Sequence, residues 1–116
     1  MHNKAKGPTK AERHRMAWMK EDGCIACRQI GRNAQADVDH EVIGGKRTGH
    51  DRTIPLCPWH HRGIPPYGWT ASMANMELGA TKCKEMRKFY ETFGSFSEMV
   101  DATNERYRNR VKPAGY

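Results

Sequence analysis

The chain has 116 residues, a formal net charge of +7 and an isoelectric point near 9.5, and 37% of its residues are hydrophobic. This length fits one domain with a short arm and excludes two-domain dinucleotide-binding enzymes and TIM barrels. No apolar run approaches the roughly 20 residues of a transmembrane helix, and the polar start lacks the apolar segment of a secretion signal, so we expect a cytoplasmic protein whose excess of Lys and Arg favours a nucleic-acid partner.

The N-terminal part predicts a basic arm followed by a helix. Residues 1–8 are polar and basic, and we expect a flexible arm there. Thr9 and Glu12 have the spacing of a capping box, which predicts a helix that starts at Thr9 and runs to about Lys20. Gly23 then ends this helix.

The middle of the chain predicts short strands and loops. Residues 36–40 form a short run that predicts a strand, and residues 44–49 form a glycine-rich basic loop. Residues 53–57 are a second apolar stretch, but Pro55 limits it to an edge strand at best.

The C-terminal third predicts two helices. Thr81 is a plausible N-cap for a helix that ends before Gly94, and Ser95 with Glu98 is a second capping box for a helix that ends before Pro113. We expect these helices to pack against each other and to cover the β element. The prediction is therefore a single α+β domain over residues 9–112, with a tail at 113–116.

Two short-spaced pairs of metal-binding residues carry the strongest signal. Cys24 and Cys27 form a C-x-x-C pair, and Cys57 and His60 form a C-x-x-H pair. Zinc prefers four such ligands in a tetrahedron, and a structural zinc adds folding energy that a sparse core cannot supply. The alternative is that the cysteines are unrelated small buried hydrophobes.

A second constellation combines a carboxylate with two imidazoles. If Asp39 and His40 end one strand and His61 opens the helix after the other, they can meet at one point. Asp39 and His61 could then hold a divalent cation beside His40, which would take a proton from water. The alternatives are a solvated Asp39, a surface His40, and His61 as the fourth zinc ligand in place of His60.

These residues resemble the ββα-metal (HNH) endonuclease signature. Asp39-His40, the glycine-rich loop and the run Thr-Ile-Pro-Leu-Cys-Pro-Trp-His-His-Arg at 53–62 carry the resemblance. Within that superfamily the run is most similar to the phage RecA-dependent nucleases, the recombination enhancement function (Ref) family. The resemblance spans residues 24–100 and is most specific over 53–62.

The resemblance implies a role for each matching residue. Asp39 and His61 would bind a catalytic Mg²⁺ or Mn²⁺, a site that Zn²⁺ can also occupy, and His40 would be the general base of phosphodiester hydrolysis. The structural zinc would be held by Cys24, Cys27, Cys57 and His60. The implied partners are DNA and a RecA filament, in the cytoplasm of a bacterium or a phage-infected host.

One position departs from the HNH pattern. Arg52 stands where the signature usually has Asn, and a guanidinium cannot accept the hydrogen bond that would orient His40. Another acceptor must therefore orient the base, and Arg52 is free to clamp a phosphate. Other cations near the motif are expected to contact DNA phosphates rather than read bases, with His50 as an alternative third metal ligand. These residues are Lys46, Arg47, His50 and Arg62.

The remaining conspicuous residues have simpler expected roles. Trp59, Tyr67 and Trp69 predict packing rather than base stacking, and Cys83 predicts a buried position at the head of a helix. The arginines at 106, 108 and 110 and the lysines at 4, 6 and 10 are expected to be solvated or to touch a second stretch of duplex.

Three classes of function fit this sequence. The first is a metal-dependent DNA endonuclease, the second is a non-catalytic zinc module that binds DNA, and the third is a small interaction protein with a structural zinc. Asp39, His40 and His61 favour the first, because a module that only binds needs no carboxylate and histidine facing a second histidine.

Overall fold

A computed structural model describes residues 7–110, which contain six helices and four short strands. The helices are α1 (Lys10–Asp22), α2 (Ile25–Gln29), α3 (Pro58–Arg62), α4 (Ala71–Leu78), α5 (Met86–Phe93) and α6 (Phe96–Asn109). The strands are β1 (Asp37–His40), β2 (Val42–Ile43), β3 (Lys46–Arg47) and β4 (Thr53–Leu56). The α+β prediction is confirmed.

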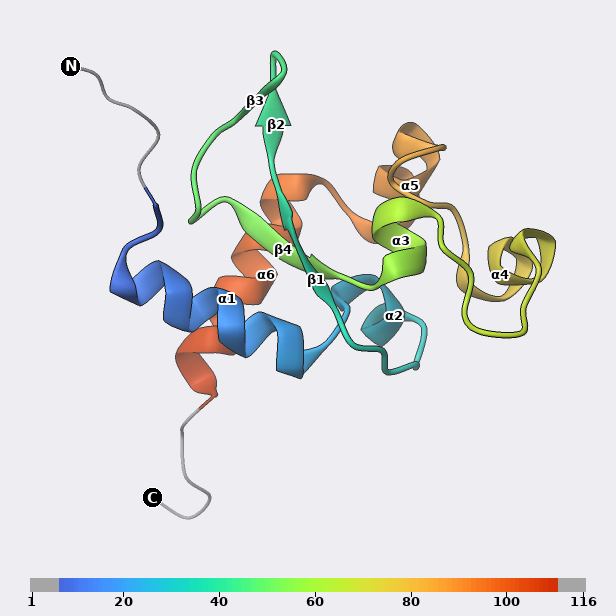
Figure 1. Cartoon of the computed structure of the whole chain (residues 1–116), viewed down its shortest axis with the longest axis horizontal. Coiled ribbons are helices and arrows are strands. Elements are labelled where there is room, and N and C mark those ends of the chain that lie inside the picture. The colour runs from blue at the N-terminus through green and yellow to red at the C-terminus, as the bar shows by residue number, and fades with distance from the viewer. Residues whose placement is uncertain (1–6, 111–116) are drawn as a thin grey trace.

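The centre of the fold is an antiparallel pair of strands followed by a helix. β1 pairs with β4 in a register that sets Asp39 opposite Ile54 and His40 opposite Thr53. Pro55 lies inside β4 opposite Val38, which the two-stranded sheet tolerates because both of its strands are edges. α3 follows β4 directly, and because β4 runs antiparallel to β1, this places α3 next to the start of β1 (Figure 1).

Helices α1 and α6 pack on this strand pair (Figure 1). All four residues of β4 are buried. The capping boxes of Thr9 with Glu12 and of Ser95 with Glu98 form as predicted. The N-terminal helix therefore begins where the sequence indicated, and Gly23 caps it with φ of +103°.

A buried arginine joins three of these elements. Arg15 of α1 is 7% exposed and donates to the Thr53 hydroxyl, to the Thr53 carbonyl at 2.9 Å and to Asn104 Oδ1 of α6 at 2.8 Å. Burial lowers the pKa of Arg15. No sequence pattern indicates this role, because Arg15 lies among exposed basic residues on α1.

The predicted C-terminal helices differ from expectation at one end. Thr81 caps only a single turn, in which its hydroxyl accepts from the Lys84 N–H at 3.2 Å, and α5 begins at Met86. The backbone of Glu85 (φ −135°, ψ 61°) separates the turn from the helix. Cys83 consequently lies on an exposed turn, so the prediction that it is buried is wrong.

The two C-terminal helices contact different parts of the molecule. α6 contacts β4 as expected, whereas Phe89 and Phe93 of α5 pack around the His60 ring with centroid distances of 6.0 and 5.1 Å. The helix α5 therefore covers the cysteine cluster.

The glycine-rich loop contains a small hairpin. β2 pairs with β3 across Gly44 and Gly45, whose φ angles of +61° and +80° suit the two-residue turns that match strand twist. The four strand residues are exposed, and the hairpin extends beyond the central strand pair (Figure 1).

Two of the sequence predictions concern chain ends. Lys4, Lys6 and the tail at 113–116 lie outside the described residues. Within residues 7–110, no helix combines the length and apolarity needed to cross a membrane. Arg106 is half exposed, as the sequence predicts, and its guanidinium also donates to both carboxylate oxygens of Asp22 at 2.6 and 2.8 Å.

Candidate metal centre and active site

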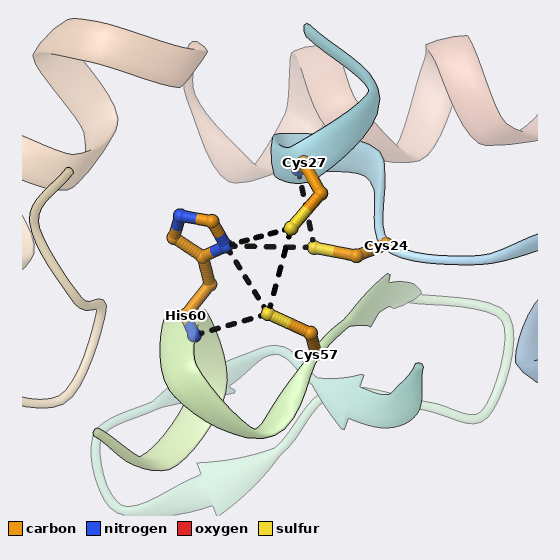
Figure 2. A group of neighbouring side chains, drawn as sticks. All are labelled: Cys24, Cys27, Cys57 and His60. Carbon is orange, nitrogen blue, oxygen red and sulfur yellow. Dashed lines mark hydrogen bonds between the residues drawn. The ribbon is translucent and has the colours of Figure 1, made fainter. Parts of the chain in front are cut away.

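The predicted zinc ligands form one buried cluster. Cys24 and Cys27 come from the start of α2, and Cys57 and His60 come from the start of α3. Figure 2 shows the three sulfur atoms and the His60 ring converging on one point. Their candidate ligand atoms all lie within 4.8 Å of one another.

The distances within the cluster fit a tetrahedral zinc ion. Tetrahedral Zn–S and Zn–N bonds of about 2.3 and 2.05 Å place sulfurs roughly 3.8 Å apart and sulfur and nitrogen roughly 3.6 Å apart. Here Cys27 Sγ lies 3.7 Å from Cys57 Sγ. His60 Nδ1 lies 3.6, 3.6 and 3.3 Å from the sulfurs of Cys24, Cys27 and Cys57. The cluster is therefore compatible with a structural zinc.

Neighbouring groups orient these ligands for a metal. His60 Nε2 lies 2.7 Å from the Leu78 carbonyl oxygen, to which it can only donate, so Nδ1 keeps its lone pair for the centre of the cluster. The N–H groups of Cys27 and His60 donate to the sulfurs of Cys24 and Cys57 at 3.3 and 3.4 Å. Hydrogen bonds of this kind stabilise thiolates, the form that binds zinc.

The cysteine and histidine side chains of the cluster also shift one another's pKa values. Hydrogen bonding with Cys24, and then with Cys27, lowers the pKa of the Cys57 thiol, whereas bonding with Cys24 and Cys57 raises the pKa of Cys27. Burial alone lowers the pKa of His60, but its contacts with Cys24 and Cys57 outweigh burial and raise the pKa to about 10. Zinc binds these side chains in their deprotonated forms, so its binding would displace the protons that they share.

The second predicted constellation is also brought together. Asp39 Oδ1 of β1 lies 3.3 Å from His61 Nε2 of α3, and the Asp39 side chain is only 5% exposed. On the other side of the ring, His61 Nδ1 lies 3.5 Å from Asp37 Oδ2. The carboxylate of Asp39, and more weakly that of Asp37, raises the pKa of His61.

This pair of side chains has the donor set of a divalent metal site. Two ligands at right angles on one ion, each at about 2.1 to 2.2 Å, lie roughly 3 Å apart, which is close to the separation of Asp39 Oδ1 and His61 Nε2. Asp39 Oδ2 and His61 Nδ1 are buried polar atoms that form no hydrogen bond within the described residues. A carboxylate oxygen and an imidazole nitrogen suit Mg²⁺, Mn²⁺ and Zn²⁺.

His40 follows Asp39 on β1 and contacts another histidine. Its Nε2 lies 3.0 Å from His50 Nδ1, and within the described residues no hydrogen bond or ion pair joins His40 to Asp39 or His61. Desolvation, followed by the positive charges of Arg47 and His50, lowers the pKa of His40. These influences favour the neutral imidazole, which is the form that a general base requires.

Arg52 is occupied by neighbours. Its guanidinium pairs with Glu41 at 3.0 Å and donates to the Ser97 hydroxyl at 2.8 Å. The guanidinium that the sequence leaves free to clamp a phosphate is thus held by Glu41, which follows β1, and by Ser97. Its role as a phosphate clamp stays a prediction.

The other predicted DNA contacts fall into two groups. Lys46 and Arg47 are exposed on the β2–β3 hairpin. Arg62 is exposed but pairs with Asp37 at 3.0 Å, and His50 contacts His40. The structure thus separates two hairpin cations from two residues with protein partners.

The three aromatic residues for which the sequence predicts packing differ in how deeply they are buried. Trp59 is 3% exposed, and its indole N–H donates to the Gly79 carbonyl at 2.9 Å, which fits the predicted packing role. Trp69 packs partly buried against the core. Tyr67 is fully exposed at 104%, so the prediction that it packs is wrong. All three line a cavity of about 460 Å³.

Sequence reasoning missed Lys82 as a neighbour of the candidate site. Its Nζ lies 3.1 Å from Asp39 Oδ2. No motif marks Lys82, since it lies 43 residues from Asp39 on the turn before α5. Only the packing of that turn against α3 reveals the contact.

The comparisons with known proteins agree with the resemblance seen in the sequence. A search of curated proteins found no relative that matches this chain. A family model described as "Recombination enhancement, RecA-dependent nuclease" matches residues 8–107 and so covers both the cysteine cluster and the Asp39–His61 pair. The family name indicates a nuclease that acts in recombination. The chain therefore belongs to the recombination enhancement, RecA-dependent nuclease family.

Proposed function

We propose that this protein is a metal-dependent endonuclease of the HNH type that hydrolyses phosphodiester bonds in DNA under the direction of a RecA-type filament. The observation that carries the proposal is the buried approach of Asp39 Oδ1 to His61 Nε2 at 3.3 Å, on the strand and helix that the signature requires. Family membership supports the nuclease activity and the link to RecA.

Asp39 and His61 would hold the catalytic ion. A divalent ion there supplies charge stabilisation for the scissile phosphate and for the 3′ oxygen that leaves. Their rigid placement on β1 and α3 supports this role, because each is anchored by the β1–β4 pairing or by the cysteine cluster at the start of α3.

His40 would take the proton from the attacking water, and His50 would position it. When His40 Nε2–H donates to His50 Nδ1, the lone pair of His40 lies on Nδ1 and is available to water. His50 thus supplies the acceptor that Arg52 cannot provide. Proton transfer by a positioned imidazole typically contributes about 10²- to 10⁴-fold to a rate.

The β2–β3 hairpin would contact the DNA backbone. Lys46 and Arg47 are exposed there, and contacts of cations with phosphates bind without reading bases. Such binding leaves the choice of target to a partner, which agrees with direction by a filament.

Cleavage of a displacement loop tests this function. Zinc-loaded protein should nick duplex DNA within a RecA-formed displacement loop when Mg²⁺ or Mn²⁺ is present. His40→Ala should lower the rate by about 10²-fold or more. His14→Ala, a change of an exposed histidine on α1, is the matched control and should cut normally.

Two results would contradict the proposal. His40→Ala protein that cuts as fast as the unmodified protein would exclude the assigned base. Protein that binds DNA but never cuts it, with any divalent ion and with a RecA filament, would instead support a non-catalytic zinc-containing DNA-binding module.

A further inference from the structure

Lys82 is the unassigned charged group closest to the proposed catalytic ion. Its side chain is 15% exposed, and its Nζ lies 3.1 Å from Asp39 Oδ2 and 3.4 Å from Asp39 Oδ1. The backbone N–H of Lys82 donates to the His60 carbonyl at 2.8 Å, which fixes the base of the side chain next to α3. The ammonium also lies 5.7 Å from the centre of the Phe96 ring.

The ammonium neutralises Asp39 without binding it tightly. Asp39 Oδ2, the nearer oxygen, receives no hydrogen bond within the described residues, and the bond to Oδ1 is long at 3.4 Å. Buried carboxylates need a positive partner, and strong ammonium–carboxylate bonds are about 2.7 to 2.9 Å long. Lys82 therefore offers charge compensation in a geometry that another cation could replace.

A divalent ion shared by Asp39 and His61 would meet this ammonium directly. Both cations would approach the same carboxylate, and their repulsion is weakly screened because the Asp39 side chain is only 5% exposed. An ammonium on a flexible four-carbon stem can move to a nearby anion, and lysine binds phosphate as a point charge. The scissile phosphate would bring such an anion to this place.

We propose that Lys82 is a displaceable counter-ion of Asp39, which moves to a DNA phosphate when substrate binds and so couples binding of the divalent ion to binding of DNA. This inference rests on the proposed function, since it assumes that Asp39 and His61 hold the ion. Coupling of this kind is reciprocal, so the divalent ion strengthens DNA binding by the same factor.

Measurement of Mn²⁺ binding tests the coupling. Calorimetric titrations would use zinc-loaded protein that carries His40→Ala, which keeps the DNA intact, with and without a short duplex. Lys82→Met removes the charge and keeps most of the length of the side chain. Lys82→Arg keeps the charge, and Lys84→Met changes an exposed lysine of the same turn as the matched control.

We expect Lys82→Met to tighten Mn²⁺ binding about tenfold in the absence of DNA. Duplex DNA should tighten Mn²⁺ binding at least about fivefold when Lys82 is present and much less in Lys82→Met. The Lys82→Arg and Lys84→Met proteins should both bind Mn²⁺ weakly in the absence of DNA and more tightly in its presence. Zinc content and circular dichroism confirm that each variant is folded.

Equal or weaker Mn²⁺ binding by Lys82→Met, or equal tightening by DNA in both proteins, would overturn the inference. Its failure is separable from failure of the proposed function. Efficient cleavage together with an Mn²⁺ affinity that does not change in Lys82→Met would refute only the inference. Coupled binding of Mn²⁺ and DNA without any cleavage would refute only the nuclease proposal. Asp39→Asn should abolish the Mn²⁺ signal and so assigns it to this site.

Discussion

At the scale of single residues, the contact between His40 and His50 offers the proposed general base an orienting partner, which the guanidinium of Arg52 cannot be. The two rings meet at 3.0 Å in an edge-to-face arrangement. When His50 Nδ1 is the acceptor, it selects the tautomer of His40 that leaves Nδ1 free for water. We therefore propose that His50 is a positioning residue, which acts through His40.

Substitution of His50 should impair catalysis more than binding. We expect His50→Leu to lower the single-turnover cleavage rate about 10- to 100-fold. Loss of a residue that orients a functional imidazole typically lowers activity by a factor of this size. His50→Asn, which keeps an acceptor, should recover part of the rate, and the KM for DNA should change little in both. A wild-type rate for His50→Leu would contradict the positioning role.

The pH dependence of cleavage should report the environment of His40. Desolvation and then the charge of Arg47 hold the pKa of His40 below its ordinary value of about 6.5. A base works only when unprotonated, so the rate should rise as pH increases through this pKa and fall as pH drops below it. Arg47→Ala removes a positive charge and should shift the midpoint of the acid limb upward.

Lys46→Ala is the control that separates the effect of charge on the pKa of His40 from the effect of charge on DNA binding. Both substitutions remove one cation from the hairpin, but only Arg47 acts on the pKa of His40. We expect Lys46→Ala to weaken DNA binding without moving the midpoint. A downward or absent shift in Arg47→Ala would contradict the assignment of His40 as base.

At the scale of elements, Arg15 connects α1, β4 and α6 through hydrogen bonds to Thr53 and Asn104. Its removal leaves the buried Thr53 hydroxyl and carbonyl without this donor. We expect Arg15→Met to lower the free energy of unfolding by about 2 kcal/mol, because unsatisfied buried polar groups cost about 1 to 3 kcal/mol each. Urea denaturation followed by circular dichroism measures the change.

Lys20→Met provides the control on the same helix, since Lys20 is exposed and surface substitutions usually stay within about 0.5 kcal/mol. An Arg15→Met protein as stable as the control would show that the buried guanidinium is dispensable.

The elements that the sequence predicted are those with local signals. The capping boxes of Thr9 and Ser95 each rest on two residues three apart, and both helices begin as expected. The start of α5 was wrong because Thr81 has the chemistry of a cap but its turn is broken at Glu85. The sequence predicts only a loop where the β2–β3 hairpin lies, because two-residue strands carry no periodicity.

The candidate site could be predicted only where spacing identifies ligands. The Cys24–Cys27 and Cys57–His60 pairs were found because each pair has a fixed short spacing. The contacts of Lys82 with Asp39 and of Glu41 with Arg52 join residues of different elements. Such contacts depend on how the elements pack, which no local pattern encodes.

At the scale of the whole molecule, the cysteine cluster joins the N-terminal half to the α3 region. It links the start of α2 to the start of α3, and α3 carries His61. The central sheet has only two strands of four residues each, and such pairs are marginally stable by themselves. A structural zinc would therefore support both the fold and the position of the proposed active site.

Removal of zinc should unfold the domain. We expect about one tightly held zinc per chain, and chelation should cause a cooperative loss of helical circular dichroism, because binding to such sites supplies folding free energy. Cys24→Ser should lose the zinc. Cys83→Ser is the control, since Cys83 is exposed and lies outside the cluster, and it should keep the zinc. Full retention of both metal and fold in Cys24→Ser would refute the ligand set.

The most direct test of the account is a crystal structure of the zinc-loaded protein soaked with Mn²⁺, read by anomalous diffraction. The account predicts an Mn²⁺ peak about 2.1 to 2.3 Å from a carboxylate oxygen of Asp39 and from Nε2 of His61. Bound Mn²⁺ at another position, with Asp39 and His61 directed to separate surfaces, would contradict it.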